Sequence, residues 1–147
     1  MLLQSGLSPK YWAYAAECFC HAHNIAINDG DSAWNKRRKQ GQFAGAQFPF
    51  GALVSFMPQP AIKAKGAFDQ RSNDGMFLGY HIAAGGLWKG DYLIADYQPL
   101  KADIDGAPSS TKVLRTSELI LPVGGKVEFP IAELRRRRDV IDQDYGV

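Results

Sequence analysis

Short apolar segments separated by glycine- and proline-rich turns constrain the fold of this 147-residue chain more than any other feature. Each segment is a few residues long and is bounded by turn residues, which is typical of strands. Several short strands with such connections indicate a small barrel or sandwich. The candidate strands are Phe50–Phe56, Gly75–Ile82, Tyr92–Tyr97, Lys112–Thr116 and Glu118–Leu121.

An amphipathic helix is predicted ahead of these strands. Ser8 can cap free backbone N–H groups, and Pro9 suits the first helical turn, where its missing donor costs nothing. Apolar residues then recur at steps of three and four until the turn residues Asn28–Gly30. Because an isolated helix is marginal in water, this one needs a partner surface. The predicted apolar stripe consists of Trp12, Ala15, Ala16, Phe19, Ala22 and Ala26.

Polar segments flank the candidate strands on both sides. Residues 31–47 are polar, basic and glycine-containing, so we expect a basic linker or exposed loop there. Residues 125–147 are expected to form a charged tail or a short helix. The prediction is therefore an α+β chain, with a helix in residues 1–30 and a small, mainly antiparallel β-barrel in residues 48–124.

Basic residues are concentrated in two runs, although the net charge is only +2. Lys36, Arg37, Arg38 and Lys39 form the first run, and Arg135–Arg138 form the second, so eight of the 17 basic residues lie in them. Local fields from such runs matter more than the net charge. We predict that the first run contacts DNA phosphates, with a solvated loop as the alternative.

The second run has acidic neighbours. Glu133, Asp139, Asp142 and Asp144 surround it and can neutralise its arginines as pairs on a helix face. A nucleic-acid contact through Arg135–Arg138 is therefore less favoured than one through the first run. The aromatic residues Trp88 and Tyr92 leave a similar choice open: they can stack on bases or bind a partner, but packing at the edge of the barrel is the default.

Cysteine and histidine spacing argues against a metal site. On a helix, Cys18 lies on one face with His21, and Cys20 lies nearly opposite with His23, so the four cannot meet on one ion. The two cysteines cannot bridge each other for the same reason, which favours an intracellular, reducing setting. Asp103–Gly106 is interpreted as a plain turn rather than a calcium loop. No metal, cofactor or small-molecule substrate is predicted.

Membrane association is not expected either. No apolar run approaches the roughly 20 residues that a membrane-spanning helix needs. The N-terminus also lacks the basic start and the long apolar stretch of a signal peptide.

The first 30 residues contain a pattern that resembles a known family. A turn of a small residue, glycine, leucine and proline leads into an aromatic-Trp-Ala helix at the end of the integrase core in copia-type retrotransposon polyproteins. That family usually has Asn-Arg-x-Pro where this chain has Asn24-Ile25-Ala26-Ile27, so the end of the helix departs from the pattern. The matching residues are Met1-Leu2, Ser5-Gly6-Leu7-Ser8-Pro9, Tyr11-Trp12-Ala13, Ala15 and Asn24.

A second set of residues is similar to the SH3-like barrel that follows the integrase core in the same polyproteins. In that barrel a Phe-Gly-x-x-x-Val strand precedes a Lys-Phe/Leu-Asp-x-Arg loop and a Gly-x-Phe-Leu-Gly-Tyr strand. Ala52 stands where the family commonly has cysteine, and Leu87–Tyr92 departs from the usual Gly-Tyr-Arg-x-Trp pattern. The matching residues are Phe50-Gly51-Ala52-Leu53-Val54, Phe68-Asp69-x-Arg71 and Gly75-Met76-Phe77-Leu78-Gly79-Tyr80.

The resemblance implies a division of the chain and a function. Residues 1–30 would be the last helix of a truncated RNase H-like integrase core, and residues 48–124 the SH3-like barrel. The Asp-Asp-Glu carboxylates that hold two divalent metal ions belong upstream of Ser8, so we expect no catalytic residue and no enzyme activity in this chain. We also expect Met1 to be an internal methionine of a longer reading frame or of a decayed copy.

The expected function is that of a non-catalytic accessory module for DNA integration, acting in the nucleus or in a cytoplasmic virus-like particle. Its partners would be DNA, through the basic runs, and the integrase core or other parts of the polyprotein. Two alternatives remain open. The barrel could be a protein-interaction module that docks on the core or on another subunit, or the chain could be a transposon relic without function.

Overall fold

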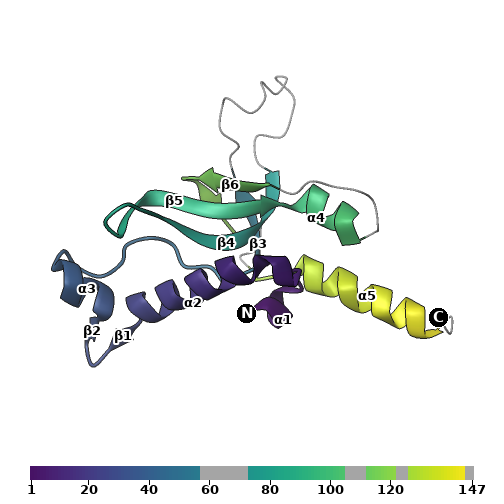
Figure 1. Cartoon of the computed structure of the whole chain (residues 1–147), viewed down its shortest axis with the longest axis horizontal. Helices are drawn as coiled ribbons and strands as arrows, with labels where there is room; N and C mark the ends of the chain where they lie inside the picture. Colours follow the sequence, from purple (N-terminus) through teal and green to yellow (C-terminus); the bar gives the residue numbers. More distant parts are fainter. Residues whose placement is uncertain (57–72, 105–111, 122–125, 145–147) are drawn as a thin grey trace, which may run out of the picture.

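The computed structural model describes residues 1–56, 73–104, 112–121 and 126–144, which combine a five-stranded antiparallel sheet with helices on one side of it (Figure 1). Helix α2 (Trp12–Ile25) lies along the sheet beneath β4 (Asn73–Ala83), and α5 (Pro130–Asp144) extends away from the sheet toward the C-terminus. The predicted α+β class is therefore confirmed. The loop Phe68–Arg71 lies outside the described residues, as do residues 105 and 106 of the predicted turn Asp103–Gly106. The other two residues of that turn, Asp103 and Ile104, are instead the end of a helix, α4 (Tyr97–Ile104), so the turn prediction is wrong there.

The predicted N-terminal helix is present, but Ala15 is the one residue of the predicted apolar stripe that it buries. A short 3₁₀ turn, η1 (Pro9–Tyr11), begins at Ser8, whose Oγ accepts a hydrogen bond from Lys10 N at 3.4 Å, and α2 continues to Ile25. Trp12 and Phe19 of the predicted stripe are 65% and 60% exposed. The residues that α2 and its preceding turn bury are Tyr11, Ala15, Cys18, His21 and Ile25.

Residues 31–47, predicted as a linker or exposed loop, are partly folded. A two-residue hairpin of β1 (Ile27–Asn28) and β2 (Asp31–Ser32) leads into helix α3 (Ala33–Arg38). Ser32 caps α3, because its Oγ accepts a hydrogen bond from Asn35 N at 3.1 Å. Phe43 is buried in the main core. The segment was predicted as a loop because it is polar overall, although it contains the helix cap Ser32 and the core residue Phe43.

The sheet has the order β6-β5-β4-β3-β7. Its long central hairpin is β4 and β5 (Leu87–Asp96), and β3 (Leu53–Phe56) pairs with the other side of β4. The edge strands are β6 (Val113–Thr116) and β7 (Leu119–Ile120). All five candidate strand segments therefore contribute strands to one sheet.

The two edge strands are consecutive in the chain, and only residues 117 and 118 separate them. Three Cα–Cα steps span at most about 11 Å. The sheet must therefore curl until its opposite edges are near each other. Across the residues that the structure describes, β6 and β7 do not pair, so the sheet is not closed into a barrel.

Two glycines set the close contacts at the centre of the fold. Gly51 N donates a hydrogen bond to Phe77 O at 2.7 Å, which places the segment before β3 against β4. Gly79 has a φ of +142° beside an irregularity in the β4–β5 pairing, and a Cβ there would lie 3.7 Å from Cys18 Cβ. The predicted bend and close approach at Gly79 are thus both present, where α2 crosses the sheet.

Two further helices complete the described structure. Helix α4 (Tyr97–Ile104) follows β5 directly, and the four-residue helix α1 (Leu2–Ser5) packs on α5. For residues 125–147 the prediction was a charged tail or a short helix, and residues 130–144 form the helix α5. The fully buried Ile131 anchors α5. Among the described residues, no helix is long and apolar enough to cross a membrane.

Candidate nucleic-acid interface

Helix α3 is held in place by a network around Asp31. Its Oδ1 accepts hydrogen bonds from Ser32 N at 2.8 Å, Asn35 Nδ2 at 2.9 Å and Gln42 Nε2 at 2.9 Å. These bonds, from Asn35 and Gln42 most strongly, lower the pKa of Asp31 below its ordinary value. The network joins the start of α3 to the segment that follows it. The basic run at the end of α3 is therefore attached to a fixed support.

One of the four predicted contact residues has a structural role. The Arg38 guanidinium lies 3.7 Å from the centre of the Trp34 ring, and its Nη2 donates a hydrogen bond to Gly86 O. This pair of contacts ties α3 to the turn between β4 and β5. Lys36, Arg37 and Lys39 are instead exposed. Three of the four predicted side chains are therefore exposed near one another, whereas the fourth, Arg38, packs against Trp34 and Gly86.

Behind α3 lies an aromatic cluster that joins three parts of the chain. The His21 ring is 4.3 Å from Tyr80, 4.9 Å from Phe43 and 5.5 Å from Trp34, measured between ring centres. Trp88 continues the cluster at 4.7 Å from Phe43. Edge-to-face and tilted pairs of this kind stabilise aromatic cores.

Trp88 and Tyr92 are packed rather than free to stack on bases. Trp88 Nε1 donates to Asp91 O at 2.8 Å, and the Tyr92 hydroxyl accepts from Ala46 N at 3.0 Å. The two rings lie 5.4 Å apart. The default prediction for this pair, packing at the sheet, is confirmed.

His21 is a buried titratable group at the centre of the cluster. It is 9% exposed, and burial together with the nearby Arg38 charge lowers its pKa to about 4. Its imidazole is therefore neutral at physiological pH. Nε2 of His21 and Nη1 of Arg38 are both buried and have no hydrogen-bond partner among the described residues. Unsatisfied buried polar groups of this kind are rare in folded proteins.

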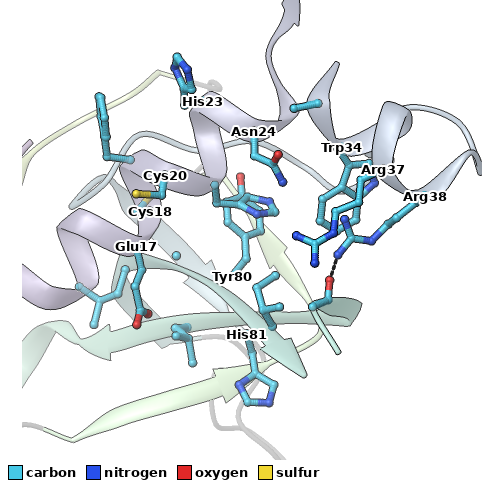
Figure 2. A pocket seen from close by; sticks show the side chains of 18 residues that line it. Glu17, Cys18, Cys20, His23, Asn24, Trp34, Arg37, Arg38, Tyr80 and His81 are labelled. Carbon is cyan, nitrogen blue, oxygen red and sulfur yellow. Dashed lines mark hydrogen bonds between the residues drawn. The ribbon is translucent and has the colours of Figure 1, made fainter. Parts of the chain in front are cut away.

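A groove of about 710 Å³ opens next to these two residues (Figure 2). Helix α2 forms one wall, α3 forms the end, and strands β4 and β5 form the floor. Arg37 and Arg38 line its α3 end, while Glu17 and Asn24 enter from α2. Of the residues that line the groove, Arg37 and Arg38 were the ones predicted from the sequence to bind a ligand. The groove itself could not be predicted, because it forms only when Arg38 reaches the turn between β4 and β5.

The two cysteines differ in environment. Cys18 is buried under the sheet, and burial raises the pKa of its thiol to about 11, whereas Cys20 is exposed. They lie on different sides of α2, as the spacing predicted. Within the described part of the chain, no group of His, Cys, Asp or Glu side chains is arranged to hold a metal ion.

We expect only one thiol to react in the folded protein. At pH 8, iodoacetamide should alkylate Cys20 rapidly and leave Cys18 unmodified, because the thiolate is the nucleophile and Cys18 is buried and protonated. Mass spectrometry of the intact protein should show a single adduct, and Cys20→Ser should show none. In urea both thiols should react. Two adducts in the native protein would contradict the packing of α2 on β4.

The second basic run is largely occupied within its own helix. Arg136 and Arg137 pair with Glu133, the latter at 3.4 Å, and Arg135 Nε donates to Gly6 O. The predicted neutralisation by Glu133 is therefore confirmed. This run differs in that respect from Lys36, Arg37 and Lys39, for which the described residues supply no ion pair.

Helix α2 presents a second surface, made of residues outside its buried face. Trp12 and Phe19 are largely exposed there, with the small residues Ala13 and Ala16 between them. Phe19 stacks on His23 at 6.4 Å. We call these residues the outer face of α2.

Comparison of the chain with protein-family models, with curated proteins and with solved structures finds no match in any of the three.

Proposed function

We propose that this protein is a non-catalytic, nucleic-acid-binding module of a copia-type retrotransposon integrase region. The observation that carries the proposal is the end of α3, where Lys36, Arg37 and Lys39 are exposed on a helix that Asp31 and Arg38 fix in place. Cations held on a rigid support contact phosphates at a lower entropic cost than cations on a free loop.

The fold supports the family part of this proposal. The segments around Gly51 and Gly79, which carry the resemblance to the SH3-like barrel, lie next to each other in one curled sheet. An α-helix precedes that sheet, in the order found in the polyproteins. In this proposal the curled sheet is the SH3-like domain, α2 is the last helix of the integrase core, and the protein acts inside the cell.

Titration with a fluorescent 20-base-pair DNA duplex at 50 and 200 mM salt tests the binding. Three phosphate contacts predict a plot of log K against log salt concentration with a slope of about −2.7. The variant in which Lys36, Arg37 and Lys39 are all replaced by glutamine should lose most of this slope. The matched control replaces Arg136, Arg137 and Arg138 by glutamine, which removes the same charge from α5.

Equal loss of affinity in both triple variants would contradict the α3 interface, since it would mean that only net charge matters. Absence of binding at 50 mM salt would overturn nucleic-acid binding altogether.

The outer face of α2 favours a second candidate function, which is docking on the integrase core or another polyprotein subunit. Exposed aromatic residues beside small ones form a surface that a protein partner can cover. If the duplex does not bind, retention of the protein by an immobilised Asp-Asp-Glu core in the absence of DNA would support this alternative. Trp12→Ser should then abolish the retention.

A further inference from the structure

The groove beside α3 has two features that are typical of a ligand-binding site. Its volume, about 710 Å³, falls in the range of roughly 300 to 1,000 Å³ that is usual for small-ligand sites. Two buried nitrogen atoms at its edge, Arg38 Nη1 and His21 Nε2, lack partners within the described residues. Neither feature depends on the exposed lysines of α3.

Charge is distributed unevenly along the groove. The Arg37 and Arg38 side chains lie together at the α3 end, and Figure 2 shows both turned toward the groove. Two adjacent guanidinium groups repel each other, and an anion that binds to both of them would offset that repulsion. The α3 end is therefore suited to a phosphate group.

The rest of the groove is suited to a flat, apolar ring with a polar edge. Ile82 and Leu93 of the sheet give the groove an accessible apolar floor. Asn24 and Glu17 project from α2 above this floor (Figure 2). An amide and a carboxylate at the rim can hydrogen-bond the edge of a nucleobase.

We propose that this groove binds one unpaired nucleotide of a single strand, with its phosphate on Arg37 and its base against Ile82 and Leu93. The proposal rests on the proposed function and goes beyond it, because it adds recognition of an unstacked base to contact with phosphates. A base within a duplex cannot enter the groove, since both of its faces are covered by neighbouring bases. The protein would then distinguish strand ends or single-stranded segments from intact duplex.

A substitution that changes no charge distinguishes binding of the base from contact with the phosphate. Ile82 is 39% exposed and lines the groove, so Ile82→Trp should fill the space that the base occupies. The probes are a fluorescent 12-nucleotide single strand, a 12-nucleotide strand of abasic sites and the 20-base-pair duplex, all measured by anisotropy. For the unmodified protein, the strand with bases should bind about 5- to 100-fold more tightly than the abasic strand.

Ile82→Trp should abolish that difference and leave duplex affinity unchanged, which also shows that the variant is folded. Arg37→Gln should weaken single-strand binding about ten-fold, compared with three-fold or less for its matched neighbour Lys36→Gln, which does not line the groove. On duplex the two variants should be equivalent.

Equal binding of the two single strands, or no effect of Ile82→Trp on them, would overturn the groove site while duplex binding still supports the α3 interface. Displacement of the strand by polyglutamate at the same charge concentration would also overturn it, in favour of an acidic peptide. If none of the three nucleic acids binds, the proposed function fails together with this inference.

Discussion

Replacing Gly51 by alanine is expected to lower the free energy of unfolding by about 3 kcal/mol, because strain and overpacking add at this position. The φ of Gly51 is +79°, which costs an L-residue about 1 to 2 kcal/mol. An added Cβ would also lie 2.1 Å from the Cβ of Ser5, which is fully buried, so α1 or the segment before β3 must move. Urea unfolding followed by circular dichroism would measure the loss.

Gly85 provides the matched control for this substitution. Its φ is +82°, nearly that of Gly51, but a Cβ there would meet nothing within 4 Å. Gly85→Ala should therefore show the strain alone. Adding Ser5→Gly to Gly51→Ala should recover part of the remaining difference in a double-mutant cycle. If Gly51→Ala costs no more than Gly85→Ala, the close contact between α1 and this segment is wrong.

Acidification from pH 7.5 to 4.5 is expected to reduce the free energy of unfolding by about 2.5 kcal/mol through His21 alone. The pKa of His21 is about 4 in the folded protein and 6.5 in its ordinary state. Between these values the unfolded chain binds the proton and the folded chain does not. Stability is therefore fully present above pH 6.5 and is lost as the pH falls toward 4. Urea unfolding at a series of pH values measures the dependence.

Other groups also titrate in acid, so the comparison of variants isolates His21. His21→Phe keeps an aromatic ring in the cluster and should remove about 2.5 kcal/mol of the pH dependence between pH 7.5 and 4.5. His23→Gln, on the exposed side of the same helix, is the matched control substitution. The lowered pKa of Asp31 acts only below its ordinary value of 3.8, outside this window. A pH profile shared by the unmodified protein and His21→Phe would contradict the burial of His21 beside Arg38.

The strands were predictable because local signals and tertiary structure agree there. Gly75–Ile82 and Tyr92–Tyr97 alternate with glycine turns, and all of these residues except Tyr97, which begins α4, lie in the central hairpin. The start of α2 was equally clear, because Ser8 and Pro9 act through the backbone alone. Such features depend on a few neighbouring residues and not on what packs against them.

The buried face of α2 could not be predicted in the same way. Hydrophobicity favoured Trp12 and Phe19, yet the helix buries Cys18 and His21. The aromatic cluster that surrounds His21 comes from residues more than ten positions away, so nothing local signals its preference. Burial depends on the partner surface, which the periodicity of one helix does not contain.

Helix α3 and the groove were missed for a related reason. A helix of six residues is too short for periodicity to reveal. The groove requires Arg38 to reach Gly86, 48 residues further along the chain. The basic run itself was visible, but nothing in the sequence distinguishes Arg38 from its neighbours. Its different role appears only in its contacts with the Trp34 ring and the Gly86 carbonyl.

The junction of β6 and β7 has a mechanical consequence for the whole sheet. Because residues 117 and 118 join the two edge strands directly, neither strand can separate from the sheet without displacing the other. Ordinary open sheets fray independently at each side, but here amide exchange in 113–116 and 119–120 should rise together, with one shared opening rate. The two-residue link therefore couples the two edge strands, and we expect them to open as a single unit.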